Sequence, residues 1–149
     1  MKPYYVREVT LVYGKSKALA PRVLKDHEDV ASFAREVIGN RVTESILAIA
    51  VTARHKPMAW SVIATGTPTL CIIQPSDVLR FVLLSGCPGF FLAHNHPSND
   101  VSPSDDDVRL TRNLIASSKL LGLTLIDHVI VAEEGSISLR ADPHMIGGW

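Results

Sequence analysis

The chain has 149 residues, of which 46% are apolar and 20% are charged, an ordinary balance for a globular protein. The length favours a single domain, 1–149, with enough buried surface for a real core. Fifteen basic and fifteen acidic residues give a formal net charge of zero, so no basic excess argues for a nucleic-acid partner.

No stretch approaches the run of about 18 apolar residues that a membrane helix needs, so no membrane span or membrane partner is expected. The first seven residues lack the apolar segment of a signal peptide. The two cysteines, Cys71 and Cys87, are too few for a disulfide framework. Together these features predict a cytoplasmic protein with reduced thiols.

The first half of the chain predicts a strand, a helix and a hairpin. Residues 4–13 alternate between apolar and polar types, which is typical of a strand. Asp26 is a good N-cap, and the apolar residues after it recur at helical spacing until Gly39. Ser45–Val51 predicts a buried strand, and residues 58–64 predict its hairpin partner.

The second half alternates helices and strands. Residues 70–73 predict a short strand, and a helix starts at Pro75 and stops before Gly86. Residues 90–96 predict a strand that the following proline ends. The sequence from Ser102 predicts a capped helix start with Pro103 in the first turn.

That helix is expected to end near Leu121, with Gly122 as its C′ residue. Residues 123–132 and 137–139 predict a terminal hairpin, and residues 141–149 have no periodic pattern and predict a tail. The fold class is therefore α/β or α+β, with a mixed, largely antiparallel sheet flanked by about three helices.

The chemistry concentrates between residues 94 and 107. His94 and His96 are two residues apart on a strand, so their side chains share one face. Asp107, in the helix that follows, can add an oxygen, which completes the three protein ligands of a catalytic zinc. Ser104 lies near enough in sequence to donate to an oxyanion, and Glu44, at the start of an apolar strand, is the candidate general base.

Each of these residues also has a simpler interpretation. Ser104 and Asp107 can form a capping box, and three aspartates in a first helical turn complement the helix dipole without any metal. Glu44 can be a solvated residue at the end of a strand. His128, in a buried strand, is more often a hydrogen-bonded core histidine, or one that supports a ligand, than a ligand itself.

The spacing H-x-H-x7-S-x2-D, preceded by a glutamate, resembles the JAMM motif of the JAB/MPN metalloenzyme superfamily. The sequence from His94 through Ser98, with Pro103-Ser104, is similar to its RadC-like branch, in a short form without room for a helix-hairpin-helix segment. Asn99 stands where this branch usually has glycine. Asparagine tolerates the left-handed conformation, so the turn is expected to survive.

The resemblance implies a JAB/MPN-like fold and a Zn²⁺ ion bound by His94, His96 and Asp107. It also implies Glu44 as the general base and Ser104 as an aid to holding the oxyanion. The expected function is a zinc-dependent hydrolase that cleaves an amide, in a peptide or isopeptide bond of a protein substrate. Two alternatives are a role in DNA repair or mobile-element biology, and a binding module whose metal is structural.

Overall fold

The computed structural model describes Gly14, residues 22–67 and residues 73–149. The predicted strand at 4–13 lies outside the described residues. So does the predicted strand at 70–73, except for Ile73, which precedes a helix and is not in a strand.

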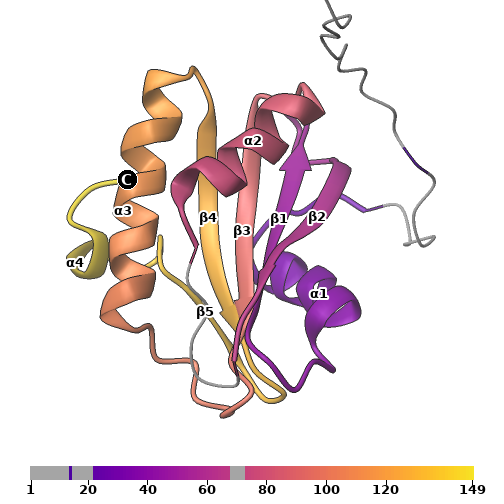
Figure 1. Ribbon diagram of the computed structural model, residues 1–149, viewed down its shortest axis with the longest axis vertical. Helices are drawn as coiled ribbons and strands as arrows, with labels where there is room; N and C mark the ends of the chain where they lie inside the picture. The colour runs from indigo at the N-terminus through magenta and orange to yellow at the C-terminus, as the bar shows by residue number, and fades with distance from the viewer. Residues whose placement is uncertain (1–13, 15–21, 68–72) are drawn as a thin grey trace, which may run out of the picture.

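Five strands form one sheet, in the order β2-β1-β3-β4-β5 (Figure 1). Their bounds are β1 Ser45–Val51, β2 Pro57–Thr65, β3 Gly89–Asn95, β4 Thr124–Val131 and β5 Ser136–Ser138. β3 and β4 are parallel, whereas the other neighbouring pairs are antiparallel. The predicted fold class, a mixed and largely antiparallel sheet with flanking helices, is confirmed.

The helices cover both faces of this sheet. Helix α1 (His27–Ile38) packs on one face, while α2 (Pro75–Ser85) and α3 (Asp105–Leu120) lie on the other (Figure 1). Asp26 caps α1 as predicted, because its side chain accepts a hydrogen bond from the backbone of Asp29. None of the helices in the described part of the chain is long and apolar enough to span a membrane.

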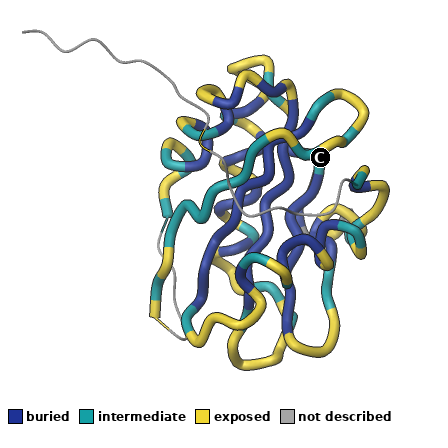
Figure 2. The backbone as a smooth tube through the Cα atoms, turned by 90° about the vertical axis from the view of Figure 1, so that its right-hand side faces the viewer, coloured by how far each residue is buried: buried dark blue, intermediate teal, exposed yellow. Residues whose placement is uncertain are grey.

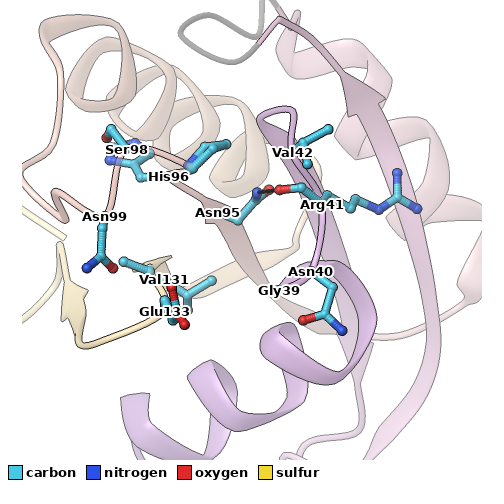
Figure 3. A pocket seen from close by; sticks show the side chains of 12 residues that line it. Gly39, Asn40, Arg41, Val42, Asn95, His96, Ser98, Asn99, Val131 and Glu133 are labelled. Atoms are coloured by element: carbon cyan, nitrogen blue, oxygen red, sulfur yellow. Dashed lines mark hydrogen bonds between the residues drawn. The ribbon is translucent and has the colours of Figure 1, made fainter.

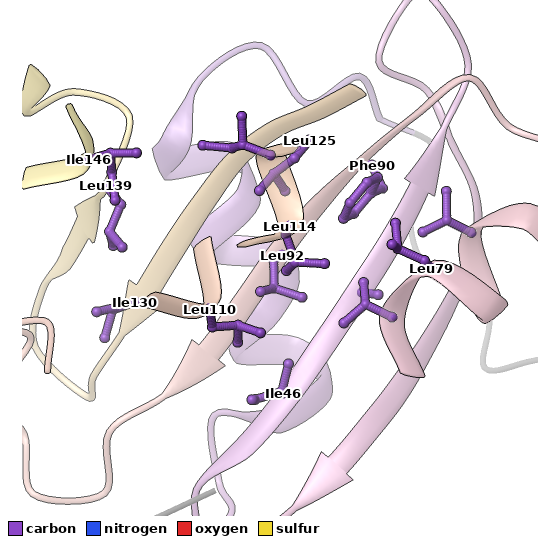
Figure 4. Close-up of a cluster of buried hydrophobic side chains, with 14 residues drawn as sticks. Ile46, Leu79, Phe90, Leu92, Leu110, Leu114, Leu125, Ile130, Leu139 and Ile146 are labelled. Atoms are coloured by element: carbon purple, nitrogen blue, oxygen red, sulfur yellow. The ribbon is translucent and has the colours of Figure 1, made fainter. Parts of the chain in front are cut away.

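The central strands are buried on both sides (Figure 2), which explains their continuous apolar runs. Alternate residues enter two separate apolar clusters. Phe90 and Leu92 point toward α2 and α3, into the cluster drawn in Figure 4, whereas Phe91 and Ala93 point toward α1. Two apolar layers therefore hold β3 in place, and its end is a rigid base for polar side chains.

Helix α3 starts two residues later than a cap at Ser102 would place it. Its N-cap is Ser104, so Pro103 lies before the helix and not in its first turn. The side chain of Asp107 accounts for the difference, because it accepts a hydrogen bond from the backbone of Ser104 and closes a capping box there. Gly122 follows the helix with φ +68°, as its predicted place at C′ requires.

The end of the chain differs from the predicted tail. Pro143–Ile146 forms the short helix α4, and Ile146 is buried in the cluster between the sheet and α3. Trp149 packs against the same cluster, and its indole N–H donates to the carbonyl of Leu125 at 2.9 Å. Two apolar side chains are enough to dock this segment, although they are too few to produce a recognisable period.

Replacing a buried residue of α3 tests this packing. Leu114 is fully buried between the helix and the sheet, so Leu114→Ala should lower the free energy of unfolding by about 2–5 kcal/mol. Leu120 lies on the same helix but is 89% exposed, so Leu120→Ala should change it by no more than about 0.5 kcal/mol. Urea denaturation measures both, and equal effects would contradict the packing described.

Candidate metal centre

Four of the five predicted site residues meet at one end of the sheet, where β1 and α3 begin and β3 ends (lower end in Figure 1). Glu44 immediately precedes β1, His94 lies in β3, His96 follows β3, and Asp107 is in the first turn of α3. One ligand atom from each lies within 4.8 Å of the others. These four side chains could hold a metal ion.

The two histidines share a face because the strand geometry continues past the end of β3. The backbone N–H of His96 donates to the carbonyl of Val131 at 2.8 Å and so extends the pairing with β4 by one residue. The Nε2 atoms of His94 and His96 consequently lie 2.8 Å apart. The chain then turns at Asn99, whose φ is +64°, so the expected left-handed turn is confirmed.

Asn95, between the histidines, points to the opposite face and was missed as a functional residue. Its side-chain oxygen accepts from the backbone N–H of Ser45, and its amide nitrogen donates to the carbonyls of Arg41 and Thr43. Thr43 and Ser45 flank Glu44, so one amide ties the backbone around Glu44 to the end of β3. Strict alternation along the strand was the signal that could have found it.

The carboxylate of Asp107 is both the predicted metal ligand and a partner in the predicted capping box. Asp107 Oδ2 accepts from the backbone N–H of Ser104 at 2.8 Å and from its hydroxyl at 2.7 Å. The other oxygen, Oδ1, lies 3.3 Å from His94 Nε2, whereas His96 Nε2 lies 3.8 Å from Oδ2. Capping therefore orients the carboxylate and leaves one oxygen available as a ligand.

These atoms fit a zinc ion. Zinc–nitrogen distances of about 2.0–2.1 Å place neighbouring ligand atoms of a tetrahedral site about 3.3 Å apart. The observed separations are 2.8 Å between the two histidine nitrogens, 3.3 Å from His94 Nε2 to Asp107 Oδ1 and 3.8 Å from His96 Nε2 to Asp107 Oδ2. The carbonyl of Asp100 can only accept, so His96 Nδ1 carries the hydrogen of their hydrogen bond. A neutral His96 therefore has a bare Nε2, which faces the other candidate ligand atoms.

Glu44 completes the group from the side of β1. Its backbone N–H donates to the carbonyl of Thr67, and its own carbonyl accepts from Gly66, so the end of the hairpin fixes its position. The residue is only 9% exposed. Burial raises the pKa of its carboxyl group; Asp107 raises it further, whereas His94 and His96 act in the opposite direction.

The pKa of Asp107 shifts the other way. Burial alone would raise it, but the neighbouring His94 ring and the hydrogen bonds from Ser104 outweigh that effect and hold the pKa far below its ordinary value of 3.8. The two carboxyl groups of the site are thus in different environments. The lowered pKa keeps Asp107 ionised, and the raised pKa lets Glu44 hold a proton more readily.

Behind His94 lie two fully buried polar side chains. His128 Nε2 is 2.8 Å from His94 Nδ1, and His128 Nδ1 is 2.7 Å from the hydroxyl of Thr111. His128 is therefore a hydrogen-bonded core histidine beside a candidate ligand, as predicted, and burial lowers its pKa well below 6.5. Thr111 was missed; its place four residues after Asp107, on the same side of α3, was the available signal.

A pocket of about 650 Å³ adjoins the centre at His96 (Figure 3). It lies between the segment after α1, which includes Asn40 and Val42, and the turn after β3, which includes Ser98 and Asn99. Ser104, the fifth predicted residue, lies beside the group and contacts it through Asp107. The roles of all five residues stay predictions.

The model of the RadC-like JAB domain family matches residues 24–145. The chain belongs to the RadC-like JAB family. This confirms the resemblance inferred from the motif spacing. The four side chains that meet at the end of the sheet in this RadC-like chain are those of the JAMM pattern.

Several relatives are named UPF0758 proteins. One from Carboxydothermus hydrogenoformans is 30% identical over 115 residues, which cover 77% of this chain and 51% of that protein. One from Cyanothece sp. is 32% identical over 126 residues, covering 85% of this chain and 52% of that protein. The RadC-like chain thus spans about half the length of the curated relatives it matches, whose names give no activity.

The ionised state of Asp107 predicts a pH-dependent stability. Because its pKa is lowered in the folded protein, its stabilising effect is present above about pH 4 and is lost as the pH falls. In metal-free protein, the difference in unfolding free energy between wild type and Asp107→Asn should therefore shrink below about pH 4. Urea denaturation across this range measures it. The control is Leu120→Ala on the same helix, which removes no ionisable group and is 89% exposed, so its difference from wild type should not change over this pH range.

Proposed function

We propose that the RadC-like chain is a zinc-dependent hydrolase that cleaves an amide, in a peptide or isopeptide bond. His94, His96 and Asp107 would hold the ion, because their ligand atoms converge at separations that suit zinc. A zinc ion bound there lowers the pKa of water and polarises the substrate carbonyl. The convergence of these three atoms next to a buried carboxyl group, Glu44, is the observation that carries the proposal.

Glu44 is proposed as the general base. Its carboxylate takes a proton from the attacking water as the oxygen–carbon bond forms, and then gives that proton to the amine nitrogen as the carbon–nitrogen bond breaks. Because its pKa is raised, it lies closer to the operating pH, which suits a group that first accepts a proton and then donates it. The backbone hydrogen bonds of Glu44 with Thr67 and Gly66 hold the residue beside the two histidines and Asp107.

Ser104 is proposed to stabilise the oxyanion. In the structure its hydroxyl hydrogen goes to Asp107 Oδ2, while its oxygen accepts from the backbone N–H of Asp107. Rotation of the hydroxyl hydrogen alone would redirect it toward an oxyanion, and the oxygen would still cap the helix. The residue is exposed, so a substrate can approach it.

The position of the centre favours a catalytic metal over a structural one. Two apolar clusters pack the sheet against α1 on one face and against α2 and α3 on the other, and neither depends on a metal ion. Removing a metal would therefore leave the described core intact, unlike small domains that fold only around their metal. Three protein ligands with a fourth position next to Glu44 also match the arrangement of catalytic zinc sites.

Metal analysis tests the proposal first. Protein purified without an affinity tag should take up about one equivalent of zinc, and dialysis against a chelator should abolish hydrolysis of a peptide or isopeptide panel. Far-ultraviolet circular dichroism should not change on metal removal. Less than about a tenth of an equivalent after zinc titration would refute the metal site, and unfolding of the metal-free chain would favour a structural metal.

Glu44→Gln tests the base. The variant keeps the shape of the side chain but cannot accept the proton, so hydrolysis should fall by about 10²- to 10⁴-fold while the zinc content stays the same. Glu134→Gln is the matched control, because Glu134 is exposed and belongs to no predicted site. Equal turnover by wild type and Glu44→Gln would remove Glu44 from the mechanism.

A further inference from the structure

A chain of three buried hydrogen bonds starts in helix α3 and ends at the metal centre. The hydroxyl of Thr111 bonds to the carbonyl of Asp107 at 2.6 Å and to His128 Nδ1 at 2.7 Å. His128 Nε2 bonds to His94 Nδ1 at 2.8 Å. Thr111, His128 and His94 are each 0% exposed, so water does not supply other partners.

The hydrogens in this chain can be assigned one after another. A carbonyl only accepts, so the single hydroxyl hydrogen of Thr111 goes to the carbonyl of Asp107. The hydroxyl oxygen must then accept from His128 Nδ1, which carries a hydrogen. Both ring nitrogens of His128 form hydrogen bonds with uncharged groups, and the ring is fully buried. A positive charge on this ring would therefore cost free energy, so His128 is neutral.

A neutral His128 with its hydrogen on Nδ1 has a bare Nε2. His94 Nδ1 must therefore donate to it, which leaves His94 Nε2 without a hydrogen. This nitrogen faces Asp107 and, at 2.8 Å, the bare Nε2 of His96, a contact between two lone pairs that a cation bound there would relieve. The reverse assignment, with hydrogens on Nε2 of both His128 and His94, is excluded at the Thr111 hydroxyl. It would place the hydroxyl oxygen of Thr111 and the carbonyl oxygen of Asp107 at 2.6 Å with no hydrogen between them.

We propose that Thr111 and His128 are positioning residues that fix His94 in the tautomer with a bare Nε2. The inference rests on the proposed function, since it concerns the ligands of that metal. A histidine can bind a metal only through a nitrogen without a hydrogen, and the partner of the other nitrogen sets the tautomer. His96 reaches the same state by a shorter route, through the carbonyl of Asp100.

Both routes end at a main-chain carbonyl. For His96 it is the carbonyl of Asp100 in the turn after β3, and for His94 it is the carbonyl of Asp107, itself a proposed ligand. The side chain of Asp107 would bind the metal while its backbone sets the tautomer of a second ligand. Helix α3 thus contributes to the centre twice.

Nuclear magnetic resonance of the metal-free wild type tests the assignment directly. Long-range proton–nitrogen correlations of the imidazole rings, at neutral pH with a chelator present, distinguish a protonated ring nitrogen from a bare one. His94 and His128 should each show the hydrogen on Nδ1 and a bare Nε2. A hydrogen on Nε2 of either ring overturns the proposal, whether or not the protein binds zinc.

Removing the hydroxyl tests the consequence for the metal. In Thr111→Val, His128 Nδ1 loses its acceptor, and the ring is free to move its hydrogen to Nε2 and reverse the tautomer of His94. Zinc affinity, measured by competition with a chromophoric chelator, should fall about 10- to 100-fold. Thr111→Ser retains the hydroxyl and should restore the affinity to within about threefold of wild type.

Ser118→Ala is the matched control. Ser118 is 1% exposed on the same helix, and its hydroxyl has no hydrogen-bond partner in the described part of the chain, so its removal deletes a buried hydroxyl outside the relay. Its zinc affinity should equal that of wild type.

Failure of this inference differs from failure of the proposed function. Wild-type affinity in Thr111→Val, or no recovery in Thr111→Ser, overturns the relay while the metal site stands. A wild type that binds no zinc refutes the proposed function, and the tautomers of its metal-free form still decide the relay. If Thr111→Val does not fold, the wild-type spectrum alone decides.

Discussion

Alternation of side chains at the end of β3 is the constraint on which the whole centre depends. His94 and His96 point to the face that carries α3, and Asn95 points to the other. One tripeptide therefore supplies two candidate ligand nitrogens and also secures the backbone on both sides of Glu44. A shift of register by one residue would exchange the faces and destroy both arrangements together.

That alternation is reliable because β3 is held by apolar contacts on both faces and by neighbours on both edges. β1 pairs with it in antiparallel fashion and β4 in parallel, so no edge is open to slippage. The polar groups enter this packed layer only at its end, where each buried ring or amide has partners. The order of the centre is thus a consequence of the core beneath it.

Much of this arrangement was predictable from local patterns. The apolar run Ser45–Val51 and the period after Asp26 identified β1 and α1, and the spacing from His94 to Asp107 identified the ligand candidates. The start of α3 was wrong because Ser102 and Ser104 both suit an N-cap, and only the side chain of Asp107 distinguishes them. The tail prediction failed because docking through Ile146 and Trp149 leaves no period.

Non-local features were harder to predict. Asn95 and Thr111 act through partners on other elements, and their roles depend on pairing between strands and on the approach of α3. No spacing within one segment encodes the contact between Thr111 and His128, since it joins a helix to a strand. Glu44 was a candidate because it starts an apolar strand and fits the motif, but its neighbourhood is created only when β1 pairs with β3.

Electrostatics give the clearest reason why this end of the sheet should attract a divalent cation. With neutral histidines, the group carries two carboxylates, and Asp107 raises the pKa of Glu44 in their confined space. His94 and the hydrogen bonds of the α3 cap keep Asp107 ionised, and burial together with the charge of Asp107 raises the pKa of Glu44. A dication between them would neutralise both charges and reverse the direction of the shift on Glu44. The helix cap, which at first competed with the metal as an explanation of Asp107, therefore helps to keep this carboxylate ionised.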